Sequence, residues 1–255
     1  MTDVQHPKLS VRGLTRRFGG LIAVKDVDLD LHEGEVHAVI GTNGAGKSTL
    51  INMLSGEMPV SSGTIKLEGK DVTRMPQPHR SKAGIGRSYQ RTTIFQEFTV
   101  LENCRLAAQA QSHTRPWHIW QASQHCASSL ERARDALGRA GLEAYANTHA
   151  GSLSHGAKRQ LEVAMCLATQ PQVLLLDEPL AGMGSEETER MLGLLGDLKS
   201  GHAVLLVEHD MDAVFRIADR ITVMVNGSVV ATATPDRIRI DPVVRTAYLG
   251  EEQHD

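Results

Sequence analysis

The sequence predicts an α/β fold, with a mostly parallel sheet, an N-terminal antiparallel β portion and an inserted α-helical subdomain. Three observations support this prediction. The first third of the chain consists of strand-like segments separated by tight turns. Between about residues 100 and 150 the composition shifts to Ala, Gln, Arg, Glu and Leu without strand-like alternation. From Ser154 onward, helical and strand-like segments alternate, which is typical of a parallel sheet covered by helices.

The N-terminal portion begins with two strand-like segments, Leu9–Phe18 and Ala23–Leu31, whose residues alternate with a period near two. A mostly apolar strand, Glu35–Ile40, then runs directly into a glycine-rich loop. The residues that follow, Gly46–Leu54, have the apolar spacing of a helix. A turn and the strand Thr64–Leu67 complete this portion.

The middle of the chain is predicted to form helices at Leu101–Gln111 and Gln121–Gly141, separated by a stretch that Pro116 breaks. In the remainder we predict helices at Ser154–Thr169, Ser185–Leu198 and Met211–Ala218, and strands at Gly84–Tyr89, Val173–Asp177, Ala203–Val207, Ile221–Val225 and Ser228–Thr232.

Composition excludes several classes of protein. The 255 residues are 41% hydrophobic, enough for a sizeable core, and the net charge of −3 gives no basic field for nucleic acid. Cys104, Cys126 and Cys166 are widely spaced, which argues against a disulfide scaffold or a zinc site. No apolar run approaches the ~20 residues of a membrane span, and the N-terminus lacks the apolar segment of a secretion signal. We therefore expect a cytoplasmic protein whose membrane role, if any, comes through partners.

The glycine-rich loop matches the pattern G-x-x-x-x-G-K-[ST] between a predicted strand and a predicted helix, the context of a phosphate-binding loop. Glycines let successive N–H groups point at one anion, and the helix N-terminus adds partial positive charge. Lys47 is expected to reach the β- and γ-phosphates of ATP, and Ser48 to ligate Mg²⁺. The predicted nucleotide-binding residues of this phosphate loop are Gly41, Thr42, Asn43, Gly44, Ala45, Gly46, Lys47, Ser48 and Thr49.

An apolar strand, Val173–Leu176, ends in Asp177 and Glu178. Ligands bind at the carboxyl ends of parallel strands, so both carboxylates are expected beside the phosphate loop. We predict that Asp177 binds Mg²⁺ and that Glu178 is the general base that polarises the attacking water.

The order of further motifs resembles the ATP-binding subunits of ABC transporters over nearly the whole chain. Leu153–Ala157 (LSHGA) resembles the family signature LSGGQ, and Ala181–Gly184 occupies the position of its D-loop. The resemblance implies that Gln90 is the Q-loop glutamine, whose amide oxygen binds Mg²⁺ or the attacking water, and that His209 is the switch histidine on the γ-phosphate. It also implies that Phe18 stacks on adenine, and that Ser154 and Gly156 close over the ATP held by the opposite subunit.

The resemblance further implies a P-loop NTPase (RecA-like) core and a single ABC ATPase domain over residues 1–255. Residues 1–99 and 156–255 would form the α/β core, and about 100–155 the helical subdomain that ends at the signature.

The sequence departs from the family at three places. His155 replaces the first signature glycine, Ala157 replaces the usual glutamine, and Gly182–Gly184 lacks the D-loop aspartate. Because Ser154 and Gly156 remain, we expect catalysis to persist.

Within the family, the chain is similar to the LivG-type ATPase of branched-chain (hydrophobic) amino acid importers. The segments that carry this similarity are Arg17–Leu21, Gly84–Gln90, Phe98–Asn103, Val207–Met211 and Ala247–Glu251. The similarity implies a second ABC ATPase subunit (a LivF-type heterodimer, or a homodimer), two integral-membrane permeases and an extracytoplasmic solute-binding protein. The chain would lie peripherally on the inner face of the cell membrane. Trp117 and Trp120 either help to seat a permease or pack within the helical subdomain; both alternatives are open.

Other hypotheses remain open at this point. Urea or short-chain amide importer ATPases are also similar, notably at Leu153–Gly156 and Ala181–Met183. ATPases of lipopolysaccharide export share the tail pattern but match less well elsewhere. A soluble ABC protein acting on nucleic acid would usually show tandem cassettes, long coiled coils or basic patches, none of which this sequence has. A non-hydrolysing module would be free to lose Lys47, Asp177, Glu178 and His209, all of which are present.

Overall fold

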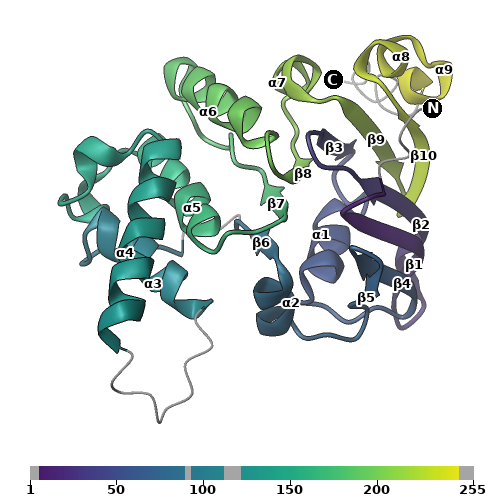
Figure 1. Cartoon of the computed structure of the whole chain (residues 1–255). Helices are drawn as coiled ribbons and strands as arrows, with labels where there is room; N and C mark the ends of the chain where they lie inside the picture. Colours follow the sequence, from purple (N-terminus) through teal and green to yellow (C-terminus); the bar gives the residue numbers. More distant parts are fainter. Residues whose placement is uncertain (1–5, 90–92, 112–121, 247–255) are drawn as a thin grey trace, which may run out of the picture.

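A computed structural model describes residues 6–89, 93–111 and 122–246. A four-stranded antiparallel sheet, in the order β2-β1-β4-β5, forms the N-terminal portion (Figure 1). Leu9, Val11 and Leu14 of β1 lie fully buried between this sheet and the rest of the core. The strands are β1 (Leu9–Phe18), β2 (Leu21–Leu31), β4 (Ser62–Leu67) and β5 (Lys70–Asp71).

The second sheet has six strands in the order β10-β9-β3-β8-β7-β6, and all neighbours are parallel except β10 and β9. Every residue of β3, β7 and β8 is buried, as expected of parallel strands covered on both faces. Its strands are β3 (Val36–Gly41), β6 (Ile85–Arg87), β7 (Val173–Asp177), β8 (Ala203–Val207), β9 (Arg220–Val225) and β10 (Ser228–Ala233).

Alternation along β7 divides the core into two parts. Leu174 and Leu176 pack with the helices α3, α4, α5 and α6, whereas Val173 and Leu175 pack with α1 and the antiparallel sheet. The helices involved are α1 (Lys47–Ser55), α3 (Val100–Ala110), α4 (Ala122–Arg139), α5 (His155–Ala168) and α6 (Ser185–Leu198). A third cluster lies beneath α7 (Met211–Ile217), α8 (Pro235–Ile240) and α9 (Pro242–Val244).

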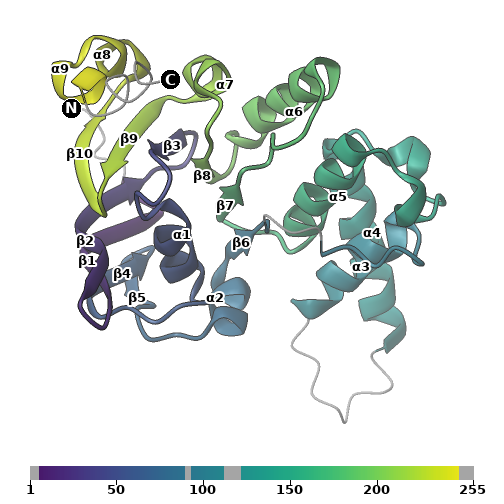
Figure 2. The same cartoon turned by 180° about the vertical axis from the view of Figure 1, so that it is seen from behind.

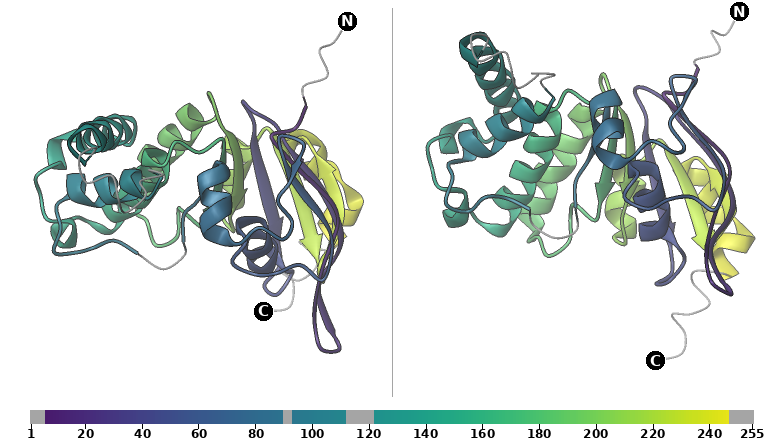
Figure 3. Two further views of the ribbon diagram at one scale, coloured as in Figure 1. Left: turned by 60° about the horizontal axis from the view of Figure 1, so that its bottom comes forward. Right: turned by 90° about the horizontal axis from the view of Figure 1, so that it is seen from below.

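Helices α3, α4 and α5 pack together as a helical lobe beyond β6, on the side away from the antiparallel sheet (Figures 1 and 2). The views in Figure 3 show the same separation. Helix α3 begins with a capping box, in which Thr99 Oγ1 accepts from Glu102 N and Glu102 Oε2 accepts from Thr99 N. Helix α5 also contacts α6, so it links the lobe to the core.

The predicted fold class is therefore confirmed, including the antiparallel portion and the helical insertion. Four short elements were not predicted from the sequence: β5, α2 (Gln77–Ala83), α8 and α9. Each of these elements has seven residues or fewer, too short to show a clear hydrophobic period. Within the described ranges no helix is long and apolar enough to cross a membrane. Gln90, Trp117, Trp120 and the segment 247–251 lie outside the described residues.

Candidate functional site

The phosphate loop leaves the carboxyl end of β3 and enters α1, as its motif requires. Gly46 is the N-cap residue of α1, with φ +98°, and its carbonyl accepts the first helical hydrogen bond from Leu50 N at 2.8 Å. A Cβ atom on Gly46 would lie 2.4 Å from Ala23 O, which belongs to β2. Glycine is needed here both for the left-handed backbone and for this close approach.

Lys47 is the first residue of α1 and is 5% exposed. Its ammonium donates to Gly41 O at 2.6 Å and to Thr42 O at 3.0 Å, which holds the side chain across the loop. Burial lowers the pKa of Lys47, while the charges of Glu178 and Asp177 oppose this shift. Ser48 is exposed at the mouth of the loop.

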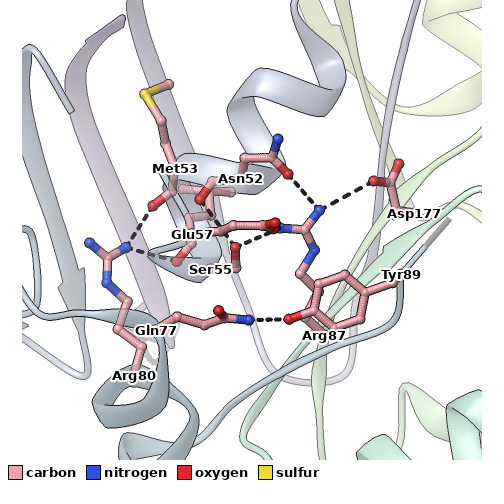
Figure 4. A network of polar contacts seen from close by, with 10 residues as sticks. Asn52, Met53, Ser55, Glu57, Gln77, Arg80, Arg87, Tyr89 and Asp177 are labelled. Carbon is pink, nitrogen blue, oxygen red and sulfur yellow. Dashed lines mark hydrogen bonds and ion pairs between the residues drawn. The ribbon is translucent and has the colours of Figure 1, made fainter. Parts of the chain in front are cut away.

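Asp177 ends β7 and is 5% exposed. Burial raises the pKa of its carboxyl group, and the nearby Arg87 guanidinium opposes that rise. Asp177 Oδ2 lies 3.5 Å from Arg87 Nη2 (Figure 4), whereas Oδ1 is buried without a hydrogen-bond partner among the described residues. An unpaired, buried carboxylate oxygen suits a hard cation such as Mg²⁺, which prefers oxygen ligands.

Glu178 has a left-handed backbone, with φ +49°, an uncommon conformation for a residue other than glycine. Its N–H donates to Val207 O at 2.9 Å, which joins the ends of β7 and β8. His209 follows β8, and its Nε2 lies within hydrogen-bond distance of Glu178 Oε1. The structure thus pairs the predicted base with the predicted switch histidine.

Glu208 directly precedes His209, and its role was not predicted from the sequence. It is 3% exposed, and burial raises the pKa of its carboxyl group. Glu208 Oε1 accepts from Leu180 N at 2.8 Å and Oε2 accepts from His209 N at 3.1 Å. One buried carboxylate therefore fixes the backbone after Glu178 and the backbone that carries His209.

A pocket at the surface brings the predicted parts together. Glu178 and His209 face the phosphate loop across it, and Ala23 of β2 forms part of its wall. Its other lining residues are Asn43, Gly44, Ala45, Gly46, Lys47, Ser48 and Thr49. The arrangement provides N–H donors, a cation and a carboxylate–histidine pair around one space, which fits a nucleotide phosphate group.

Phe18 is not among the residues that line this pocket. Phe18 ends β1 and is 43% exposed, with the guanidinium carbon of Arg16 at 4.6 Å from its ring centroid. An exposed aromatic ring on this strand leaves a face for a base, and its role in stacking on adenine stays a prediction. The role of Gln90 also stays a prediction.

The signature segment forms the start of α5. Ser154 is the N-cap residue, and its Oγ accepts from Ala157 N at 3.2 Å. A carboxylate of the same chain binds here: Glu187 Oε1 accepts from Ser154 Oγ at 2.9 Å and from Gly156 N at 3.2 Å. These hydrogen bonds, led by that from Ser154, lower the pKa of Glu187. The segment thus binds a negatively charged oxygen.

Two of the three departures from the family pattern, His155 and the D-loop segment, meet in the structure. The imidazole of His155, at the first signature position, lies with Nε2 3.1 Å from Ala181 O, in the D-loop segment. A Cβ atom on Gly182 would lie 3.2 Å from the same nitrogen, so the adjacent glycine makes room for the ring. Sequence spacing gave no sign of this contact or of that between Glu187 and Gly156.

Comparisons with known proteins agree with this geometry. Residues 24–181 match the family model described as ABC transporter. The chain is 41% identical over 254 residues to LivG of Escherichia coli K12, the high-affinity branched-chain amino acid transport ATP-binding protein, covering 97% of this chain and 100% of LivG.

Two solved structures are similar as well. The ADP conformation of an ATP-binding cassette from an ABC transporter has a TM-score of 0.83 at 28% identity, over 96% of this chain and 99% of that one. A dimeric cassette in a post-hydrolysis state, bound to ADP and phosphate, has a TM-score of 0.74 at 25% identity, over 89% of this chain and 98% of that one.

Proposed function

The chain belongs to the ABC transporter family of ATP-binding cassettes, and we propose that it hydrolyses ATP to power an importer of branched-chain or other hydrophobic amino acids. The observation that carries the ATPase assignment is the pocket in which Lys47 and the phosphate loop face the pair of Glu178 and His209. The amino acid assignment rests on the similarity to LivG over the whole length of that protein.

In the proposed reaction, Glu178 takes a proton from the water that attacks the γ-phosphate, the bond between the γ-phosphorus and the bridging oxygen breaks, and ADP and phosphate leave. His209 bonds the Glu178 carboxylate and orients it, and Glu208 fixes His209 through its backbone N–H. Lys47 and the loop N–H groups neutralise the charge on the β- and γ-phosphates. Ser48, Asp177 and Gln90 would hold Mg²⁺, which when bound would offset the same phosphate charge.

The phosphate loop is half of the proposed site. Ser154 and Gly156 bind a carboxylate oxygen in the structure, and we propose that in an assembled dimer they bind the γ-phosphate of ATP held by the partner. The related dimeric cassette bound to ADP and phosphate supports this proposal. The partner is a LivF-type ATPase in a heterodimer, or a second copy of the chain. Phe18 stacks on adenine in the same scheme.

The remaining proposed partners are two integral-membrane permeases and, through them, an extracytoplasmic solute-binding protein. The chain would lie on the inner face of the membrane as a single ABC ATPase domain spanning residues 1–255. Its core would comprise residues 1–99 and 156–255, and its helical subdomain about residues 100–155; helix α5 begins at this boundary and packs on both parts.

Complementation tests the transported substrate. The chain is expressed in cells that lack their LivG-type ATPase and, separately, in cells that lack the ATPase of a urea importer. Uptake of radiolabelled leucine is measured in the first strain and uptake of radiolabelled urea in the second. We expect restored leucine uptake that Glu178→Gln abolishes. Restored urea uptake without leucine uptake would replace the amino acid assignment with that of a urea or amide importer.

Two variants test the ATPase assignment in the purified chain. Glu178→Gln should still bind MgATP, and its phosphate release should fall by about 10²- to 10⁴-fold, the usual contribution of a general base. Lys47→Ala should weaken ATP binding, since it removes the cation beside the phosphates. Near-normal turnover of Glu178→Gln would show that another group activates the water, and unaltered affinity of Lys47→Ala would refute the phosphate site.

A further inference from the structure

Arg87 is a buried arginine beside the proposed magnesium ligand, and neither the motifs nor the proposed mechanism accounts for it. It ends β6 and pairs in register with Leu175 of the parallel strand β7, two residues before Asp177. Its side chain is only 7% exposed. A guanidinium in such a position needs several acceptors to offset its desolvation.

Three of those acceptors come from the last turn of α1 and the residue beyond its C-cap (Figure 4). Arg87 Nη1 donates to Ser55 Oγ at 2.7 Å and to Glu57 Oε2 at 2.6 Å. Arg87 Nη2 donates to Asn52 Oδ1 at 2.6 Å. The guanidinium is therefore fixed to the helix that begins at the phosphate loop.

The fourth acceptor is Asp177. Its Oδ2 lies 3.5 Å from Arg87 Nη2, and its backbone N–H donates to Ser88 Oγ at 3.3 Å. Its other carboxylate oxygen, Oδ1, is buried and lacks a hydrogen-bond partner in the described part of the chain. One oxygen of Asp177 thus faces the arginine, and the other is left for a further ligand.

We propose that Arg87 is a positioning residue for Asp177. Its planar guanidinium ties the end of β7 to α1, so that Asp177 Oδ1 stays available to the cation that Ser48 would bind at the other end of the same helix. The proposal rests on the proposed function, in which Asp177 and Ser48 hold Mg²⁺. It assigns the orientation of the carboxylate to a residue three positions before Gln90.

The shape of the side chain matters as much as its charge. An arginine presents five donors in one plane, which allows it to bond Asn52, Ser55 and Asp177 together. The Tyr89 ring lies beneath this plane, with the guanidinium carbon 4.9 Å from the ring centroid. A lysine keeps the positive charge but presents it as a single point, so it cannot hold these acceptors in one geometry.

The test measures how binding of fluorescent mant-ADP to the full-length chain depends on Mg²⁺. We expect that Arg87→Met and Arg87→Lys need about 10- to 100-fold more Mg²⁺ to reach half of its maximal effect on mant-ADP binding. This is the usual effect of losing a residue that orients a metal ligand. Binding of mant-ADP in EDTA should stay within about twofold of wild type, because Lys47 and the loop are intact. Glu57→Gln is the matched control, because Glu57 is half exposed and the Arg87 guanidinium keeps its other contacts. The Glu57→Gln variant should behave as wild type.

Three results would each overturn the proposal: an unchanged Mg²⁺ dependence in both Arg87 variants, a wild-type response of Arg87→Lys alone, or an equal loss of affinity with and without Mg²⁺. Thermal unfolding of each variant shows whether it is folded. The Asp177→Asn variant distinguishes failure of the proposed metal site from failure of the role proposed for Arg87. If Asp177→Asn keeps the Mg²⁺ dependence, the proposed metal site is wrong; if it loses that dependence while the Arg87 variants keep it, only the role of Arg87 is wrong.

Discussion

Replacing Gly46 with alanine should destabilise the chain more than the same change at Gly44, although both glycines belong to the phosphate loop and both have positive φ. Gly46 has φ +98°, and its added Cβ would lie 2.4 Å from Ala23 O and 3.3 Å from Val24 Cγ2. Gly44 has φ +79°, and its added Cβ would meet no atom within 4 Å. The two substitutions therefore share the backbone penalty and differ in the steric contact.

The magnitudes follow from this difference. A left-handed backbone costs alanine about 1–2 kcal/mol, which is the whole expected effect at Gly44. Carbon and carbonyl oxygen approach to about 3.3–3.6 Å, so Gly46→Ala must also open the contact by about 1 Å. Strand β2 resists this movement, since Lys25 N donates to Gly227 O at 2.7 Å. Overpacking of this kind adds about 1–3 kcal/mol, for a total of roughly 2–5 kcal/mol.

The assay is urea unfolding without nucleotide, followed by far-ultraviolet circular dichroism, because nucleotide contacts would otherwise obscure the backbone effect. The free energy of unfolding should fall in the order wild type, Gly44→Ala, Gly46→Ala. Equal losses for the two variants would refute the close approach of the loop to β2.

Three further predictions concern other parts of the molecule. Glu187→Gln removes the negative charge that binds Ser154 and Gly156. In the Glu178→Gln background this change should therefore increase ATP-dependent dimerisation severalfold, as measured by light scattering. An unchanged dimer fraction would contradict this prediction. Arg80 is 1% exposed and donates to the carbonyls of Met53, Leu54, Thr73 and Met75. Arg80→Met removes these hydrogen bonds, so it should lower the free energy of unfolding in urea by about 3 kcal/mol or more. A loss under 1 kcal/mol would refute the view that these contacts stabilise the fold. Burial lowers the pKa of His37 from 6.5 to about 4, so the stability that its neutral form contributes is complete above pH 6.5 and is lost as the pH falls towards 4. The loss should be on the order of 3 kcal/mol, and His37→Gln should flatten the fall in stability between these pH values; parallel curves would show that His37 titrates normally.

Much of the fold could be predicted from local sequence pattern. The bounds of β7, β8 and α6 agree with the prediction at both ends, because a mostly apolar strand or a 14-residue amphipathic helix gives a strong signal. Helix α2 gave none. It has seven residues with proline at its start, and the contacts that hold Arg80 in place come from α1 and from the chain before α2.

In the candidate site, too, some residues could be predicted from the sequence and others could not. The motifs predicted that the phosphate loop, Glu178 and His209 would lie together, because β7 and β8 are neighbouring parallel strands whose carboxyl ends meet. Arg87, Glu187 and Glu208 could not be found in this way. Their contacts depend on which turn of α1, α5 or the loop after Glu178 lies opposite each side chain, and this is settled only by tertiary packing.

The central claim is that the phosphate loop forms a working ATPase only with the signature segment of a second subunit. The direct measurement is the initial rate of phosphate release per chain as the concentration of the chain is raised, with and without a LivF-type partner ATPase. The account predicts a low rate for dilute chain alone and a rate per chain that rises with self-association or with added partner, while Ser154→Ala in the subunit that supplies the signature prevents the rise. A full rate from a monomer, independent of concentration and of partner, would contradict it.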